Sequence, residues 1–247
     1  MSIDHSTSAT TDALRWCHTA VPRSIGPLVT TPTPSEQEPA DTGPLPTRRR
    51  PGGRTARIRT QVLDAVLAEL GEHGFDALTT DTVAARAGVH RTTVYRRWGD
   101  IGGLLADVLD AASDDDWQPP DTGSLEGDLT ALNQEIQTAL TAKPPIVTAL
   151  IAASFRSEKA AEAQQRLWED RYTRCEAVVS RAVRRGELPS GTDARRLLLA
   201  ATAPLYHQLV LLRTAPDPHL PGDAAKTAAL AAAAGAFADQ AGDDTSQ

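Results

Sequence analysis

The chain has 247 residues and a formal net charge of −7, and this length is enough for one or two domains with a substantial core. Its two cysteines, Cys17 and Cys175, lack the spacing of a metal or redox site. No stretch approaches about 18 apolar residues without polar breaks, so we expect no membrane span. The first residues lack a basic segment followed by an apolar one, so we expect no signal peptide and a cytoplasmic protein.

The N-terminal part of the chain is irregular. Residues 1–47 are rich in threonine, serine and proline and show no sustained hydrophobic period. Such a segment cannot order itself by burying apolar side chains, so we predict a disordered extension. Residues 48–54, RRRPGGR, follow as a flexible basic arm. The arm leads into a predicted helix over 55–73, where apolar residues recur at helical spacing before Gly74.

The stretch from Leu78 to Trp98 predicts two short helices joined by a tight turn. Thr80 is expected to cap the first helix, and Gly88 suits the left-handed turn that ends it. The side chains expected in the small shared core are Val83, Ala84, Ala87, Val89, Val94 and Trp98. Arg91, Thr92, Tyr95 and Arg96 then face outward, and a short helix with these groups fits a DNA major groove in shape and charge.

The charge is unevenly distributed. Residues 48–100 contain 10 arginines and 6 acidic residues, a net charge of +4, and the rest of the chain carries −11. This is the expected layout for a domain that meets DNA joined to one that does not. A chance cluster of solvated arginines would give the same charge, but the helix-turn-helix pattern makes that explanation less favourable.

The pattern T-x-x-x-V-A-x-x-A-G-V-x-x-x-T-V-Y-R-x-W, followed by Leu104-Leu105, resembles the DNA-binding domain of TetR-type transcriptional regulators. The resemblance covers about residues 55–109. It implies an all-α fold, with a three-helix DNA-binding domain followed by a helical domain for ligand binding and dimerisation. One position departs from the family, because Ile101 stands where such regulators usually carry a lysine or arginine that touches phosphate.

The resemblance also implies roles for individual residues on double-stranded operator DNA. We expect Arg91, Thr92 and Arg96 to read bases, and Thr80, Tyr95 and Arg97 to contact phosphates. The expected DNA-binding residues are Arg54, Arg57, Thr80, Arg91, Thr92, Thr93, Tyr95, Arg96 and Arg97. The basic arm is either a solvated linker or a minor-groove or phosphate contact, and its position beside the motif favours the contact.

The rest of the chain predicts further helices and no strands. They cover about 101–113, 125–142, a segment of about a dozen residues ending at Phe155, and a long amphipathic helix capped by Ser157 and closed by Gly186. Residues 193–214 are apolar on nearly every side, with Pro204 as an expected kink. An alanine-rich helix over 222–240 follows, which is either solvent-exposed or a partner helix.

A helix that is apolar all round must be buried on several faces, so we expect the last two helices to pair with their copies in a homodimer. The expected interface residues are Leu197, Leu198, Ala201, Leu205, Leu209, Leu212, Ala229 and Ala233. A small-molecule effector is expected between the helices over 125–142, 157–185 and 193–214. The expected pocket residues are Phe155, Trp168, Arg171, Tyr172, Tyr206 and His207, with a plain core role as the alternative.

No phosphate-binding loop, dinucleotide fingerprint, metalloprotease motif or nucleophile elbow occurs, so we expect no cofactor, no metal site, no catalytic residues and no enzymatic activity. The predicted organisation is an extension over 1–47, a DNA-binding domain over 48–100, a ligand-binding and dimerisation domain over 101–241 and a tail over 242–247. The expected function is a repressor released from DNA by its effector. The alternatives are a helical DNA binder without an effector, and an enzyme or carrier with a vestigial DNA-binding head.

Overall fold

The computed structural model describes residues 53–238, which form nine α-helices and one short π-helix. The predicted extension over 1–47, most of the basic arm and the tail over 242–247 lie outside the described residues. The helices are α2 (Gly53–His73), α3 (Thr80–Ala87), α4 (Arg91–Trp98), α5 (Ile101–Ser113), α6 (Leu125–Thr141), α7 (Ile146–Ser154), α8 (Glu158–Arg184), α9 (Ala194–Tyr206), the π-helix η1 (His207–Leu211) and α10 (Leu220–Ala233).

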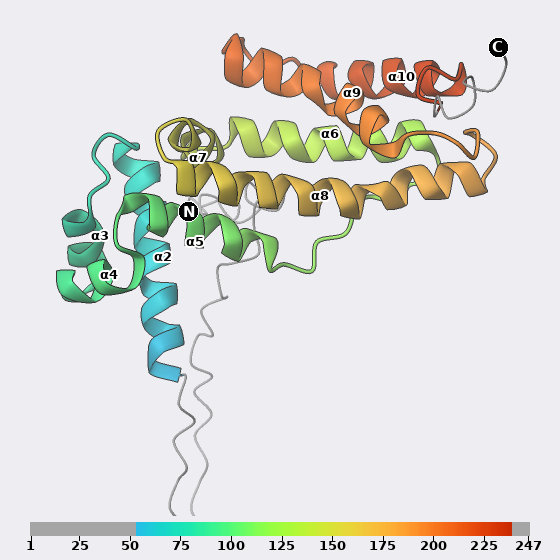
Figure 1. The fold of residues 1–247 in the computed structure, drawn as a ribbon. Coiled ribbons are helices and arrows are strands. Elements are labelled where there is room, and N and C mark those ends of the chain that lie inside the picture. Colours follow the sequence, from blue (N-terminus) through green and yellow to red (C-terminus); the bar gives the residue numbers. More distant parts are fainter. Residues whose placement is uncertain (1–52, 239–247) are drawn as a thin grey trace, which may run out of the picture.

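Helices α2, α3 and α4 form a small head at one end of the molecule, and α5 leads from it into a body made of α6 to α10 (Figure 1). The expected all-α fold is confirmed for the described residues, where the extended pairing is limited to one isolated bridge between Thr192 and Ala238. Across the same residues, no single helix is long and apolar enough to cross a membrane.

Capping residues define both ends of α3 in the helix-turn-helix, and one of them differs from the prediction. The N-cap of α3 is Thr79 rather than Thr80, and it shares a reciprocal capping box with Thr82. Thr80 is instead the first residue inside the helix, so its side chain is not used as a cap. Gly88 ends α3 in the left-handed conformation at φ 64°, as predicted, because glycine adopts this geometry without a Cβ penalty.

The two glycines after Ile101 have a packing reason. A Cβ on Gly102 would lie 2.3 Å from the Ser157 Oγ, and a Cβ on Gly103 would lie 2.1 Å from the carbonyl oxygen of Trp98. Glycine at position 103 is therefore needed for α5 to approach the backbone at the end of α4, whereas a Cβ at position 102 would displace the Ser157 side chain at the beginning of α8. Ser157 caps α8 as predicted, with its side chain accepting from the backbone N–H of Ala160.

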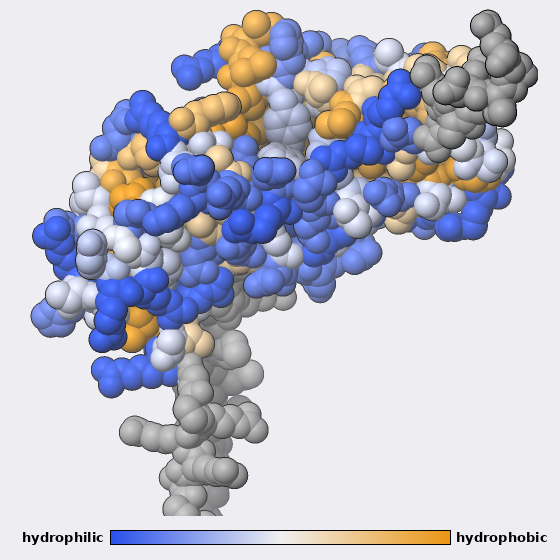
Figure 2. All heavy atoms as spheres, in the orientation of Figure 1, coloured by the Kyte–Doolittle hydropathy of each residue, from blue (hydrophilic) through white to orange (hydrophobic). Residues whose placement is uncertain are grey.

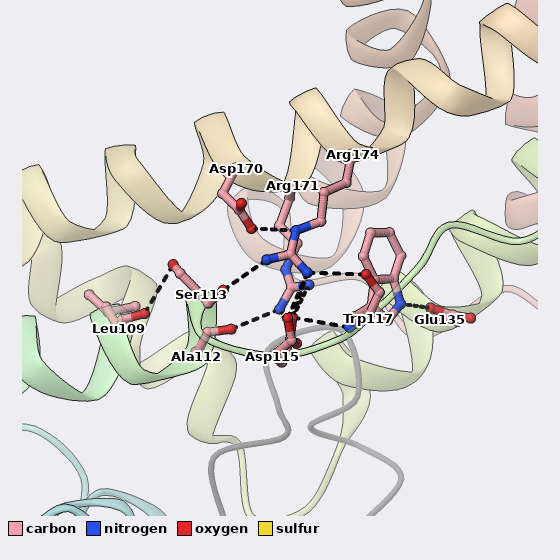
Figure 3. Close-up of polar contacts among 9 residues, drawn as sticks. All are labelled: Leu109, Ala112, Ser113, Asp115, Trp117, Glu135, Asp170, Arg171 and Arg174. Atoms are coloured by element: carbon pink, nitrogen blue, oxygen red, sulfur yellow. Dashed lines mark hydrogen bonds and ion pairs between the residues drawn. The ribbon is translucent and has the colours of Figure 1, made fainter.

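The linker between α5 and α6 is fixed to α8 by a buried ion-pair cluster (Figure 3). The side chain of Asp115 is fully buried and accepts from Arg171 Nη1 at 2.9 Å and Arg174 Nη1 at 3.0 Å. Arg171 also donates to the carbonyl oxygen of Ala112 at 2.9 Å, and its guanidinium lies 5.0 Å from the ring centre of Trp117. Arg171 thus holds the linker in place, which corrects its expected role in an effector pocket.

The predicted helix over 193–214 changes character at its proline. Asp193 caps it, but α9 ends at Tyr206 and continues as η1 only to Leu211. Pro204 has no N–H for the helix ladder, and such interruptions favour wider turns. Nearby, the buried Asn133 of α6 donates to the carbonyl oxygens of Ala201 at 3.0 Å and Pro221 at 3.1 Å, which ties three helices together.

The last helix is shorter than predicted. It spans Leu220–Ala233 instead of residues 222–240, because Ala234 and Gly235 end it and Gly235 has a φ of 83°. Cys175 is buried in the body, and burial raises the pKa of its thiol to about 12. A thiol that stays protonated behaves as a small hydrophobic side chain, as its isolated position in the sequence indicated.

Candidate DNA-binding surface and effector groove

Helix α4 presents a polar surface over a fixed apolar base. Val94 and Trp98 are buried, while Arg91, Thr92 and Tyr95 are exposed. Arg96 and Arg97 are exposed as well, and Thr93 is half-buried. The predicted base-reading residues Arg91, Thr92 and Arg96 are therefore free of the head's own core and lie on one short helix.

A carboxylate shared by three helices sets the angle of α4. Trp98 of α4 donates from Nε1 to Asp107 Oδ2 at 2.7 Å. Arg59 of α2 donates to the same carboxylate from Nε at 3.0 and 3.1 Å and from Nη2 at 2.7 Å. Burial acts to raise the pKa of Asp107, but these hydrogen bonds hold it below its ordinary value. The charged carboxylate of α5 thus clamps α2 and α4 together.

The flanking arginines lie on exposed surfaces. Arg54 and Arg57 occupy the first turns of α2, so Arg54 belongs to a helix instead of a flexible arm. Arg97 donates to the Thr55 carbonyl oxygen at 3.4 Å, and its guanidinium stacks 5.0 Å from the ring centre of Trp98. Arg91 pairs with Asp81 of α3 at 3.0 Å in a solvent-exposed contact. DNA would have to compete with this weak pair for Arg91.

The body contains a groove of about 530 Å³ between α7, α8 and α9. Its lining residues are Ile151, Ser154, Phe155, Ala161, Gln164, Gln165, Trp168, Glu169, Tyr172, Arg195, Leu199 and Tyr206. Four of the predicted effector contacts, Phe155, Trp168, Tyr172 and Tyr206, are among them. Two are not, because Arg171 is buried against the α5–α6 linker and His207 lies outside the lining. Helix α7, and not α6, forms the third wall.

Aromatic and ionic contacts organise this groove. The ring centres of Trp168 and Tyr206 are 5.4 Å apart at 85°, and those of Trp168 and Tyr172 are 6.4 Å apart at 45°. Arg195 lies 4.1 Å from the ring centre of Tyr172 and forms two hydrogen bonds to Glu169, at 2.8 and 3.1 Å. Burial raises the pKa of Tyr172, whose hydroxyl lies 3.3 Å from the Thr202 Oγ1, so it stays a neutral phenol.

Five polar groove residues were not predicted from the sequence: Ser154, Gln164, Gln165, Glu169 and Arg195. Gln164 lies one helical turn before Trp168, so the i, i+4 spacing was a usable signal. Glu169 and Arg195 are 26 residues apart and meet only because α8 and α9 pack together. Periodicity along one helix cannot indicate such a pair.

The expected dimer residues fall into two groups. Leu197, Leu198, Ala201 and Leu205 are completely buried inside the protomer, so a second copy cannot reach them, and this part of the expected interface is corrected. The other expected residues are more accessible: Leu212 and Ala233 are exposed, and Leu209 and Ala229 are half-buried.

The outward faces of α9 and α10 carry a set of apolar and small side chains that shares only Ala233 with the expected residues. It comprises Leu199, which also lines the groove, and Ala200, Ala203, Leu230 and Ala233. Leu230 is 63% exposed, and Leu199 is 42% exposed. Figure 2 shows hydrophobic side chains gathered over the end of α9, where Leu211 and Leu212 of the following segment are exposed.

The turn between α7 and α8 connects the groove to the head. Phe155 of this turn lines the groove, and the next residue, Arg156, pairs with Asp76 and lies 5.3 Å from the ring centre of Phe75. Lys159 donates to Asp100, the N-cap of α5, at 2.8 Å. A change in the groove wall therefore has a short physical route to the α2–α3 loop and to the start of α5.

Two family models match the chain. The model described as "Bacterial regulatory proteins, tetR family" covers residues 62–108, and the model described as "Tetracyclin repressor-like, C-terminal domain" covers residues 119–239. The first matches the head and α5, and the second matches the body. Among residues 53–238, no cluster of histidine, cysteine, aspartate and glutamate side chains could hold a metal ion.

Known relatives are also similar in sequence and structure. The HTH-type transcriptional regulator AqdR from Rhodococcus erythropolis is 36% identical over 64% of this chain and 77% of its own length. The DNA-binding transcriptional repressor TetR from Mycobacteroides abscessus is 37% identical over 61% of this chain and 80% of its own length. The crystal structure of the TetR family transcription regulator SCO0332 matches with a TM-score of 0.55 and 27% identity, over 70% of this chain and 97% of that one.

Proposed function

Because the chain belongs to the TetR family of helix-turn-helix transcriptional regulators, we propose that it represses transcription as a homodimer and leaves its operator when a small molecule fills the α7–α8–α9 groove. The observation that carries the DNA-binding part is the exposed face of α4, held in place by the Asp107 clamp. A rigid helix with two arginines on its free face is suited to base edges in the major groove.

The contacts with DNA divide by chemistry. Arg91, Thr92 and Arg96 read bases, since an arginine binds guanine through two hydrogen bonds. Tyr95, Thr93 and Arg97 hold the phosphates beside them, together with Thr80 and the backbone N–H groups in the first turn of α3. Arg54 and Arg57 at the exposed beginning of α2 contribute contacts that do not depend on sequence.

The dimer forms through the outward faces of α9 and α10. These faces hold the exposed apolar and small residues that one protomer leaves uncovered, and pairing with a second copy makes a four-helix interface. Leu230 and Ala233 also border a hollow of about 820 Å³ between α6 and α10, which offers room for a side chain from the partner.

Release from DNA follows from the contacts of the α7–α8 turn. A ligand that presses on Phe155 or Ser154 shifts Arg156 and Lys159, which hold Asp76 and Asp100 of the head. The two reading heads must sit about 34–36 Å apart to meet successive major grooves. A ligand that favours another spacing by about 1.4 kcal/mol weakens operator binding about tenfold.

The deciding experiment selects genomic DNA fragments with the purified protein and sequences them. A two-fold symmetric motif bound by the native chain, and blurred at single positions by Arg96→Ala, supports the proposal. An Arg96→Ala variant that keeps the native sequence preference, or a native chain that enriches no motif, would contradict it.

A further inference from the structure

We infer that the groove between α7, α8 and α9 takes a flat, uncharged aromatic molecule that carries a hydroxyl or N–H donor, and that this donor binds Gln164. The inference rests on the proposed effector role of the groove and specifies the class of ligand. Four features support it: the rings in the wall, the neutralised rim, one unpaired buried acceptor and the size of the space.

The wall of the groove is richer in aromatic residues than the chain as a whole. Aromatic residues make up 4% of the chain, yet Phe155, Trp168, Tyr172 and Tyr206 all line this one groove. Trp168 and Tyr206 stand nearly perpendicular, at 85°. Two perpendicular rings form a corner. A flat ligand ring can stack on the face of one of them and make an edge-to-face contact with the other. A saturated chain fills space there without using this geometry.

The charges at the rim are already matched. Arg195 binds both carboxylate oxygens of Glu169 and stacks on Tyr172 at 4.1 Å. An anionic ligand would have to take Arg195 from Glu169, and a cationic one would have to take Glu169 from Arg195. The two side chains are 38% and 57% exposed, so the pair itself is weak, but it leaves no unmatched charge at the rim to attract an ionic ligand, and this favours a neutral molecule.

One residue that lines the groove, Gln164, carries a buried acceptor without a donor. The Oε1 atom of Gln164 is inaccessible to solvent and has no hydrogen-bond partner among the residues that the structure describes. A buried carbonyl oxygen without a donor is unfavourable, and a ligand hydroxyl or N–H group would satisfy it. Gln164 is one turn from Trp168 on α8, so a rotation of its amide brings Oε1 to a donor on the rim of a ring stacked at Trp168.

The volume agrees with this class of ligand. A space of about 530 Å³ lies within the range of about 300–1,000 Å³ that is typical of small-molecule sites. It accommodates a fused two-ring or three-ring system. The test therefore uses four probes of similar size that separate ring, donor and charge: 2-naphthol, 2-methoxynaphthalene, 2-naphthoate and decanoate.

Calorimetric titration of the full chain with each probe tests the assignment. We expect 2-naphthol to bind tighter than 2-methoxynaphthalene by about 3- to 10-fold, the worth of one neutral hydrogen bond. Gln164→Leu should bring this ratio close to one, because the acceptor is removed while the volume is kept. Gln165→Leu is the matched control, since this neighbouring glutamine is exposed at the same groove, and it should keep the native ratio.

Three results would overturn the inference. They are tighter binding of 2-naphthoate or decanoate than of 2-naphthol, a preference for 2-naphthol that survives Gln164→Leu, and no binding of 2-naphthol at about 1 mM. Anisotropy of labelled operator DNA then separates the two proposals. If decanoate binds best and releases DNA, the effector role stands and the ligand class falls. If 2-naphthol binds with the Gln164 dependence but leaves the operator complex intact, the ligand class stands and the proposed release falls.

Discussion

At the scale of single residues, the head separates side chains that hold the fold from side chains that are free for DNA. Trp98 and Arg59 share Asp107, whereas Arg96 has an exposed side chain on the same short helix as Trp98. Substitutions in the two groups should therefore have different signatures, one in stability and the other in binding. Two predictions use this separation.

The first prediction contrasts two exposed arginines. Arg96→Ala should cost about 1–3 kcal/mol of operator binding and relax the preference at one position, because a base contact is lost. Arg57→Ala should weaken binding to all sequences alike and reduce the slope of log K against log salt by about one unit, because a phosphate contact is lost. Titrations of operator and scrambled DNA at several salt concentrations measure both effects. Equal losses on operator and scrambled DNA for Arg96→Ala would rule out base reading.

The second prediction concerns the Asp107 clamp. Asp107→Asn should lower the free energy of unfolding by about 1–3 kcal/mol at neutral pH, because charge-assisted hydrogen bonds from Arg59 and Trp98 become weaker or are lost. The folded-state pKa of Asp107 lies below its ordinary value of 3.8, so its stabilising effect is complete above that value and is lost as the pH falls through the folded pKa.

Urea unfolding of both proteins between pH 7 and pH 3 measures this dependence. The difference between native chain and variant should be constant down to about pH 5 and shrink below about pH 3.8. A difference that stays the same at pH 3 would mean that the charge on Asp107 does not contribute. Asp110→Asn is a control on the same helix, since Asp110 makes an exposed pair with Arg166.

At the scale of helices, neighbouring threonines divide two tasks at the beginning of α3. Thr79→Ala should lower the free energy of unfolding by about 1 kcal/mol, because the reciprocal capping box with Thr82 is removed. Thr80→Ala should leave stability nearly unchanged and weaken DNA binding, because its hydroxyl makes no cap and is the proposed phosphate contact in the first turn. Thermal melts and operator titrations of the two variants test the division, and a stability loss confined to Thr80→Ala would reverse it.

The ends of helices were the feature that could be predicted from the sequence. Ser157 and Gly88 act at helix ends as expected, because each cap depends on residues within one turn. The buried face of α9 could not be predicted. A helix that is apolar on every side contains no polar stripe to distinguish its own body from a partner, so Leu197 and Leu205 were assigned to the wrong contact.

Contacts between residues far apart in the sequence also limited what could be predicted about the groove. Trp168, Tyr172 and Tyr206 were predicted for the groove because aromatic residues are scarce and these recur on the body helices. Arg171 was misassigned because its partner, Asp115, lies 56 residues away in a linker with no periodicity of its own. Its position on α8 close to Trp168 made it resemble a polar pocket residue until the packing of the linker was known.

At the scale of the whole molecule, operator recognition by the proposed dimer depends on how two protomers meet, because each protomer carries one reading head. The proposed seam uses the outward side of α9 and α10, and the side of α9 that packs into the body is already full. Leu230 and Leu205 represent these two sides, since Leu230 is 63% exposed and Leu205 is completely buried. The same charged substitution at the two positions should therefore have opposite outcomes.

Leu230→Asp should give a folded monomer, because two carboxylates would be buried against each other in the seam while the protomer core is untouched. Leu205→Asp should instead prevent folding, because an unpaired charge would enter the core of one protomer. Sedimentation velocity and circular dichroism distinguish these states. A folded Leu230→Asp monomer should lose most of its operator affinity, since a single head reaches only one half-site of a pair spaced about 34–36 Å apart. A Leu230→Asp variant that remains a dimer would show that the dimer interface lies elsewhere. A folded monomer from Leu205→Asp would show that the interface uses the Leu205 side of α9, as the sequence analysis expected.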